Sequence, residues 1–309
     1  AAEAGIVTRL EAFVDTIKGF AHAHQQPGAQ HKDIYRGASA AINTRKTLLI
    51  PRMAPHAEAV AAAMQACGVN AIVLPEPDER NLFYSEQVTS GTECLPYRVT
   101  LGDFIRFYHA NGASMENFEG FNAGSYGPCR LGKYAIEQMR LLKDIGFDLP
   151  IRTTVSNNAY RDLNLGPEFE RIAWRGIVAI DCLEKMVWRT RPYETEKGAA
   201  DRLFDHYITR IADRIRSKQS YGDLLREATT RFQDLLDPNQ PRRPLIGING
   251  EIFLRSNKFS NRNLVKVCED AGLEVVVAPL GEWFKYTSYR NLEDAVSDRK
   301  FKKMLASYI

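Results

Sequence analysis

The sequence lacks the features that reveal a membrane protein or a nucleic-acid-binding protein. No run of apolar residues reaches the about 18 that a membrane-spanning helix needs. Lysine and arginine together number 41 against 38 aspartates and glutamates, so the formal charge is only +3. Because the basic residues are scattered without interleaved aromatic residues, we expect neither nucleic acid nor a membrane among the partners.

Cysteine is scarce as well. The five cysteines, spread over 309 residues, are Cys67, Cys94, Cys129, Cys182 and Cys268. Their number is odd, no two of them form a CxxC pair, and the N-terminus lacks the pattern of a secretory signal. The sequence therefore predicts no disulfide framework and favours a reducing, cytoplasmic location. Because the chain does not begin with methionine, we expect a processed chain or a fragment of a longer protein.

Common motifs for metal and nucleotide sites are also missing. The histidines form neither HxxxH nor HExxH, and GINGE (247–251) lacks the spacing of GxGxxG and of GxxxxGK[ST]. We interpret GINGE as a tight turn after a strand, which leaves Glu251 in the crevice of a second α/β unit. His56 is the one histidine just past a predicted strand, where α/β proteins usually place their sites. Surface or packing roles are the other interpretation for every histidine.

The chain does contain alternating short apolar strands and helices. KTLLIPRM (46–53) and AIVLP (71–75) flank an alanine-rich helix at 55–67, and this βαβ order predicts a parallel sheet. Gly68 is expected to end that helix. Further elements are a helix at 95–110 closed by Gly112, a helix after Cys129 and a strand at 149–156. PEPDERNLFYSEQVTSG (75–91) is interpreted as a long irregular segment or lid, and NFEGFNAGSYG (117–127) shows only a weak pattern.

The second half predicts a helical connector and another small sheet. Residues 167–237 form two long amphipathic segments broken around 189–198, where Arg191 and Glu194 suit helix capping. Strands at 244–254 and 273–280 flank a helix at 263–272. The predicted class is α/β, with two small parallel-sheet units (Rossmann- or flavodoxin-like) joined by a helical segment. The expected divisions are 1–45 (a helix at 6–23 and a linker), 46–166 (first α/β unit), 167–240 (connector) and 241–309 (second α/β unit).

Two cysteines occupy similar positions, each where a glycine-rich loop meets a predicted helix. Cys94 lies in SGTECLPYRVTLGDF (90–104), and Cys129 lies in GSYGPCRLGKY (124–134). A thiolate at a helix N-terminus is stabilised by unpaired N–H groups and by the helix dipole. The nearby basic residues, which would add positive charge, are Arg98, Arg130 and Lys133. The alternative is that both cysteines are buried and pack as small hydrophobic groups, as we expect for the other three.

Several segments together resemble a known family. They are TSGTECLPYRVTLGDF (89–104), YGPCRLGKY (126–134), AWRGIVAIDCLEK (173–185), TRPYETEKGAADR (190–202), IGINGEIFLRSNKFSNRNLV (246–265) and APLGEWFKY (278–286). In this order they resemble the C-terminal part of the large CoA-substrate-specific enzyme activases, of the 2-hydroxyacyl-CoA dehydratase (2-hydroxyglutaryl-CoA dehydratase) superfamily. The resemblance covers most of residues 46–290.

The resemblance implies a cysteine-ligated [4Fe–4S] or double-cubane cluster that an ATP-dependent activase partner reduces. Cys94 and Cys129 match two of the family's ligand cysteines. Tyr97 stands where the family commonly has a second cysteine, in ECxPC. A cluster would then need ligands from another subunit, such as the second chain of a homodimer, from a non-cysteine side chain, or from Cys182. The remaining alternative is that this chain has lost its cluster.

The function implied is an iron–sulfur electron-transfer or reductase component related to the 2-hydroxyacyl-CoA dehydratases. The residues expected near the cofactor are Arg98, Arg130, Lys133 and Glu251. The substrate would lie at the carboxyl edges of the sheets, between the two α/β units, and its identity is not predicted. The alternative function is a small-molecule-binding or scaffold domain of a larger activase protein, without a cluster.

Overall fold

The computed structural model describes residues 42–112, 115–125, 129–154 and 163–297, together with Leu10, Glu11, Phe13, Val14 and Ile17. The chain divides into two compact units, Ala1–Gly37 and Ala38–Ile309. In the first unit the described residues are helical and exposed, which agrees with a helix at 6–23. Phe20, the linker that follows and the expected polar tail lie outside the described residues.

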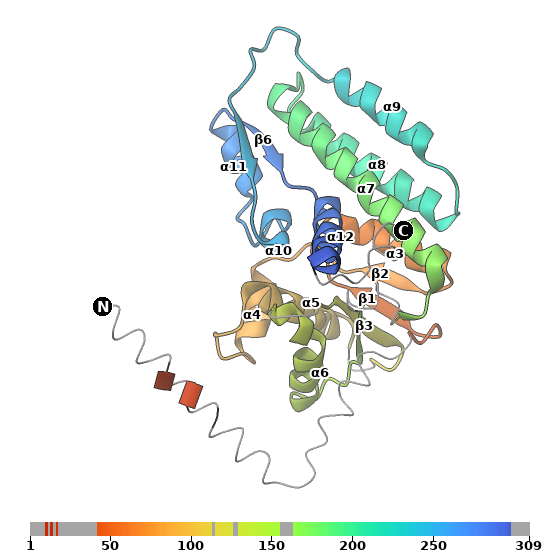
Figure 1. Cartoon of the computed structure of the whole chain (residues 1–309), viewed down its shortest axis with the longest axis vertical. Helices are drawn as coiled ribbons and strands as arrows, with labels where there is room; N and C mark the ends of the chain where they lie inside the picture. Colours follow the sequence, from red (N-terminus) through yellow and green to blue (C-terminus); the bar gives the residue numbers. More distant parts are fainter. Residues whose placement is uncertain are drawn as a thin grey trace. The chain divides into compact units, whose positions relative to one another are not determined.

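The larger unit begins with a four-stranded parallel sheet (Figure 1). Its strands are β1 (Thr47–Ile50), β2 (Ala71–Val73), β3 (Phe118–Ala123) and β4 (Ile151–Thr154). Their order across the sheet is β2-β1-β3-β4, and each neighbouring pair is parallel. The predicted βαβ unit is confirmed, because β1 and β2 are joined by α3 (His56–Ala66).

Helices cover both faces of this sheet. On one face lie α3, α7 (Gly166–Thr190) and α8 (Ala199–Arg216), and on the other lie α5 (Leu95–Asn111) and α6 (Tyr134–Asp144) (Figure 1). Leu48 and Ile50 of β1 belong to the core with α3, whereas Leu49 belongs to the core with α5 and α6. Burial on both faces explains why this strand is a continuous apolar run in the sequence.

Two predicted helix ends are confirmed by glycines in the left-handed region. Gly68 follows α3 with a φ of 83°, and Gly112 follows α5 with a φ of 81°. Glycine adopts this conformation without the steric cost that a Cβ atom imposes. The helix boundaries in this part of the chain can therefore be derived from local sequence alone.

Residues 117–127, whose hydrophobic pattern is weak, contain β3, a central strand of the sheet. Two of its residues, Glu119 and Asn122, are polar and buried, and both have tertiary partners. The Glu119 carboxylate accepts from the guanidinium of Arg152 at 2.6 and 2.9 Å. Gly120 gives room for Phe104 of α5, whose ring would lie 3.0 Å from an added Cβ. A strand with buried ionic groups and glycine lacks the apolar signal that sequence patterns detect.

The interpretation of residues 75–91 as irregular is wrong, because they contain α4 (Glu79–Glu86). Asp78 caps the helix: its carboxylate accepts from the Arg80 amide, and the Asn81 side chain accepts from the Asp78 amide at 3.1 Å. The helix packs closely on α5, since a Cβ on Gly102 would lie 2.0 Å from the Asn81 carbonyl oxygen. The short element is thus stabilised by capping and by a close helix contact.

The connector is helical as predicted, but its second segment is two helices rather than one. These are α8 and α9 (Gly222–Gln233), and Lys218 between them has a φ of 54°. Glu194 confirms its interpretation as a cap, since its carboxylate accepts from the amides of Gly198 and Ala200 at the start of α8. Arg191, in the short η4 (Arg191–Tyr193), instead pairs with Glu269 of the second α/β unit at 2.6 Å.

The second sheet has two parallel strands, β5 (Leu245–Ile248) and β6 (Glu274–Val277). Between them lie α10 (Ile252–Ser256) and α11 (Leu264–Asp270), and α12 (Leu280–Ser297) follows β6. The connector helix α7 contacts both β6 and α12. The predicted class, α/β with two small parallel-sheet units joined by helices, is confirmed. Within the described ranges, no helix has both the length and the apolar character needed to cross a membrane.

Candidate functional site

The carboxyl ends of β1 and β3 lie side by side at the centre of the first sheet. The chain leaves β1 for α3 on one face and leaves β3 for α6 on the other. Ligands of open α/β sheets usually bind outside such a switch point. The loop after β1 leads to His56, the loop after β3 leads to Cys129, and the loop before α5 ends at Cys94.

Cys94 precedes α5 and is half-buried. Its sulfur contacts the hydroxyl of Tyr134, the first residue of α6. The pKa of Tyr134 is raised by burial first, then by its hydrogen bond with Cys94 and by the charges of Cys94, Cys129 and Glu251. A phenol that keeps its proton can donate to sulfur, so Tyr134 is placed to orient the side chain of Cys94.

Cys129 is exposed and precedes η1 (Arg130–Lys133), a short 3-10 helix. Arg130 donates from Nη1 to the carbonyl of Thr92 at 3.4 Å, which joins this loop to the Cys94 loop. A Cβ on Gly132 would lie 2.3 Å from the Ser125 carbonyl oxygen, so the turn requires glycine. The two predicted cysteines thus lie on loops that contact each other, and residues 126–128 lie outside the described residues.

Tyr97 stands at the position where the resemblance predicts a second cysteine. The side chain is buried, and its ring meets that of Tyr134 edge-on with 5.4 Å between the centroids. Burial, followed by the charges of Glu137, Glu93 and Cys94, raises the pKa of Tyr97. An aromatic pair therefore occupies this place in the core of the first unit.

The other residues predicted near a cofactor differ in whether their charged groups already have partners in the structure. Arg98 forms an ion pair with Glu86 of α4, and Lys133 is exposed at the end of η1. Glu251 precedes α10, and its carboxylate accepts from the Leu254 amide at 2.8 Å. The Asn257 side chain, just after α10, donates to the carbonyls of Arg52 and Met53, so the second α/β unit lies close to this edge of the first sheet.

A cubane cluster is usually held by four cysteines, of which this chain would supply Cys94 and Cys129. Cys67 and Cys268 pack against the core on the α3 face of the sheet, whereas Cys94 packs against the core on the α5 face. Burial is the main cause that raises the pKa of Cys182, which favours its neutral thiol. Two thiols would leave the remaining ligands of a cluster to another chain, and Cys129 is exposed at this edge.

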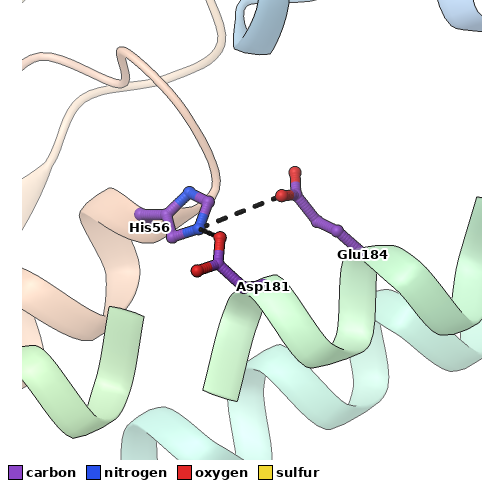
Figure 2. Close-up of side chains that lie close together, drawn as sticks. All are labelled: His56, Asp181 and Glu184. Carbon is purple, nitrogen blue, oxygen red and sulfur yellow. Dashed lines mark hydrogen bonds and ion pairs between the residues drawn. The ribbon is translucent and has the colours of Figure 1, made fainter. Parts of the chain in front are cut away.

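Figure 2 shows a second group, formed by His56 at the start of α3 and by Asp181 and Glu184 of α7. The Nε2 atom of His56 lies 2.9 Å from Asp181 Oδ1 and 3.9 Å from Glu184 Oε2. The His56 side chain is 3% exposed, so this is a buried arrangement. Among the described residues, it is the one group of three His, Cys, Asp or Glu side chains that could hold a single metal ion.

Sequence reasoning found only one member of this group. His56 was singled out by its place after a strand, but it follows no metal motif. Asp181 and Glu184 are three residues apart, a spacing that puts both carboxylates on one face of a helix. That spacing is common on solvated helices, so only the contact between α3 and α7 identifies these residues as a group.

No protein-family model, curated protein or solved structure matches this chain. The likeness to the activases and dehydratases therefore rests on the sequence segments alone. The placement of the two cysteines, described above, is the observation from which a function can be argued.

Proposed function

We propose that the chain is an iron–sulfur electron-transfer or reductase component of the 2-hydroxyacyl-CoA dehydratase type. The observation that supports this function is the placement of Cys94 and Cys129, which precede two helices on loops that contact each other. Both lie at the carboxyl edge of a parallel sheet, near its topological switch point. A cluster bound there would supply one-electron transfer at low potential.

Several residues of the chain would hold such a cluster, each with a different role. Cys94 and Cys129 would be thiolate ligands, with the hydroxyl of Tyr134 donating to the sulfur of Cys94. Arg130 links the two loops and adds a positive charge beside an anionic cluster. Glu251 would approach from the second α/β unit, and the substrate would bind between the two units.

Two thiols per chain leave ligands to be supplied from elsewhere. We propose that a second chain completes the cluster, either a second copy in a homodimer or the ATP-dependent activase that reduces it. The exposure of Cys129 supports this arrangement, because a ligand of a shared cluster must reach the surface. The substrate class stays open, with a 2-hydroxyacyl-CoA thioester as the superfamily's example.

The test is anaerobic reconstitution of the full chain with iron and sulfide. We expect bound iron and sulfide, broad visible absorption, and an increase in molecular mass in solution when the cluster forms between two copies. Cys94→Ser and Cys129→Ser should each abolish iron binding. Cys268→Ser, which alters a cysteine packed against the core, is the matched control and should retain it. A chain that stays colourless and free of iron under these conditions refutes the proposal.

One observation favours the second candidate, a small-molecule-binding or scaffold domain without a cluster. The buried pair of Tyr97 and Tyr134 fills the place of a family cysteine, as expected where a site has lost its cluster. This function predicts a chain that stays free of iron after reconstitution and that remains folded in Cys94→Ser. The reconstitution experiment therefore separates the two functions.

A further inference from the structure

The group of His56, Asp181 and Glu184 has more hydrogen-bond acceptors than donors. The Nε2–H group of His56 donates to Asp181 Oδ1 at 2.9 Å. Glu184 Oε2 lies 3.9 Å from the same nitrogen, too far for a hydrogen bond. In the part of the chain that the structure describes, no hydrogen bond reaches the Glu184 carboxylate; Lys258 acts on it only electrostatically.

The separations suit a metal ion. An ion bound by an imidazole nitrogen and two carboxylate oxygens at about 2.1 Å holds these ligand atoms about 3.4 Å apart in tetrahedral geometry. The observed distances from His56 Nε2, 2.9 and 3.9 Å, lie on either side of that value. All three ligand atoms lie within 4.8 Å of one another. Small side-chain rotations would therefore complete the site without a change in the backbone.

The surrounding structure fixes one of these ligands. The Asp181 carboxylate accepts from the backbone amides of Leu280 and Gly281, each at 2.9 Å, at the start of α12. A Cβ on Gly281 would lie 2.6 Å from Asp181 Oδ2, so glycine permits this close approach. Outer hydrogen bonds of this kind orient the carboxylates that ligate metals. Asp181 is thus held in place with its Oδ1 directed at His56.

We propose that His56, Asp181 and Glu184 bind one divalent transition-metal ion, through Nε2 and one oxygen of each carboxylate. A mixed nitrogen and oxygen set suits zinc, manganese or iron(II) better than magnesium, which prefers oxygen ligands and keeps several waters. Binding through Nε2 would require the neutral imidazole to carry its proton on Nδ1, a buried atom with no hydrogen-bond partner among the described residues. A fourth position remains for water on the side of Glu184, whose side chain is 13% exposed.

The probe for this site is Co²⁺, added to the metal-free full chain. The chain carries Cys94→Ser and Cys129→Ser, so that the thiols of the proposed cluster site cannot bind the probe. We expect one Co²⁺ per chain, weak visible bands of nitrogen and oxygen coordination, and no intense thiolate absorption. Zn²⁺ should displace the bound cobalt, and Mg²⁺ at the same concentration should not.

The decisive variant is Glu184→Gln, which removes one ligand and costs no hydrogen bond within the described residues. We expect it to weaken Co²⁺ binding by more than about 100-fold, the upper end of what loss of an outer partner causes. His56→Gln is a second variant with the same expectation. Glu168→Gln is the matched control, because Glu168 also lies on α7 but pairs with the exposed Lys218; it should bind Co²⁺ normally.

Two results would refute the proposed metal site. One is no bound cobalt in the chain that carries Cys94→Ser and Cys129→Ser, and the other is equal cobalt binding when Glu184→Gln is added to it. Thermal unfolding of the metal-free proteins should show that Glu184→Gln is folded, so that a loss of binding reports on the ligand. Because Cys94 and Cys129 are replaced in this protein, the outcome is independent of whether the natural chain binds an iron–sulfur cluster there.

Discussion

Asp103 offers a quantitative test of how this fold buries charge. It lies on α5, is 5% exposed, and accepts from the Asn81 side chain at 2.6 Å. Burial raises the pKa of Asp103 from 3.8 to about 8, against the lowering effects of the Asn81 hydrogen bond and of Arg106. The shift is about 4 pH units at about 1.4 kcal/mol each, so ionisation of this carboxyl lowers the stability of the folded state by about 6 kcal/mol at most.

The sign of the resulting pH dependence follows from the two states of Asp103. The unfolded chain loses this proton near pH 3.8, and the folded chain keeps it up to about pH 8. Unfolding therefore releases a proton within this window, and the free energy of unfolding falls by up to about 1.4 kcal/mol per pH unit as the pH rises. Below the window both states are protonated, and above it the cost is constant.

Asp103→Asn removes the charge and keeps an acceptor for the Asn81 side chain. We expect the stability of the variant relative to the parent to increase by up to about 5 kcal/mol between pH 4 and pH 9, because only the parent has a carboxyl at this position that must ionise. The assay is urea unfolding of both proteins across this pH range. The control is Asp144→Asn, at an exposed position at the end of α6. A stability difference that does not change with pH would refute the reasoning.

Two further predictions concern close packing and the buried ion pair of the first sheet. Gly102→Ala places a Cβ 2.0 Å from the Asn81 carbonyl oxygen and should lower the free energy of unfolding by about 3 kcal/mol, whereas Gly222→Ala, with open space around it, should not. Glu119→Gln leaves Arg152 without its buried carboxylate and should cost about 3 kcal/mol. Urea unfolding measures both, and parent-like stability in either variant contradicts the packing or the pairing described.

Local sequence patterns were sufficient for the elements that bury apolar side chains. The strand at 46–53 and the helix at 55–67 were predicted because their apolar residues, and the glycine that follows, report burial and chain reversal directly. The same is true of the connector helices, whose amphipathic spacing reflects one buried face. In these segments each residue's environment follows from its near neighbours in the chain.

The elements that the sequence concealed are those whose residues depend on distant partners. In β3 the buried Glu119 is stabilised by Arg152, 33 residues away, and α4 is stabilised by packing of Asn81 on Gly102. A polar residue gives no sign in the sequence of whether it will be buried with a partner or exposed to water. β3 and α4 were therefore not predicted from the sequence for the same physical reason, namely their dependence on distant partners.

The candidate sites also combine features that are local in the sequence with contacts that only the fold creates. The sequence by itself determined that Cys94 and Cys129 precede helices, because glycine-rich loops and helix starts are local features. Only the tertiary structure decided that Tyr134 contacts Cys94, and that His56 meets Asp181 across 125 residues of chain. Such contacts depend on the order of the strands and on the packing of α3 against α7, which no local pattern encodes.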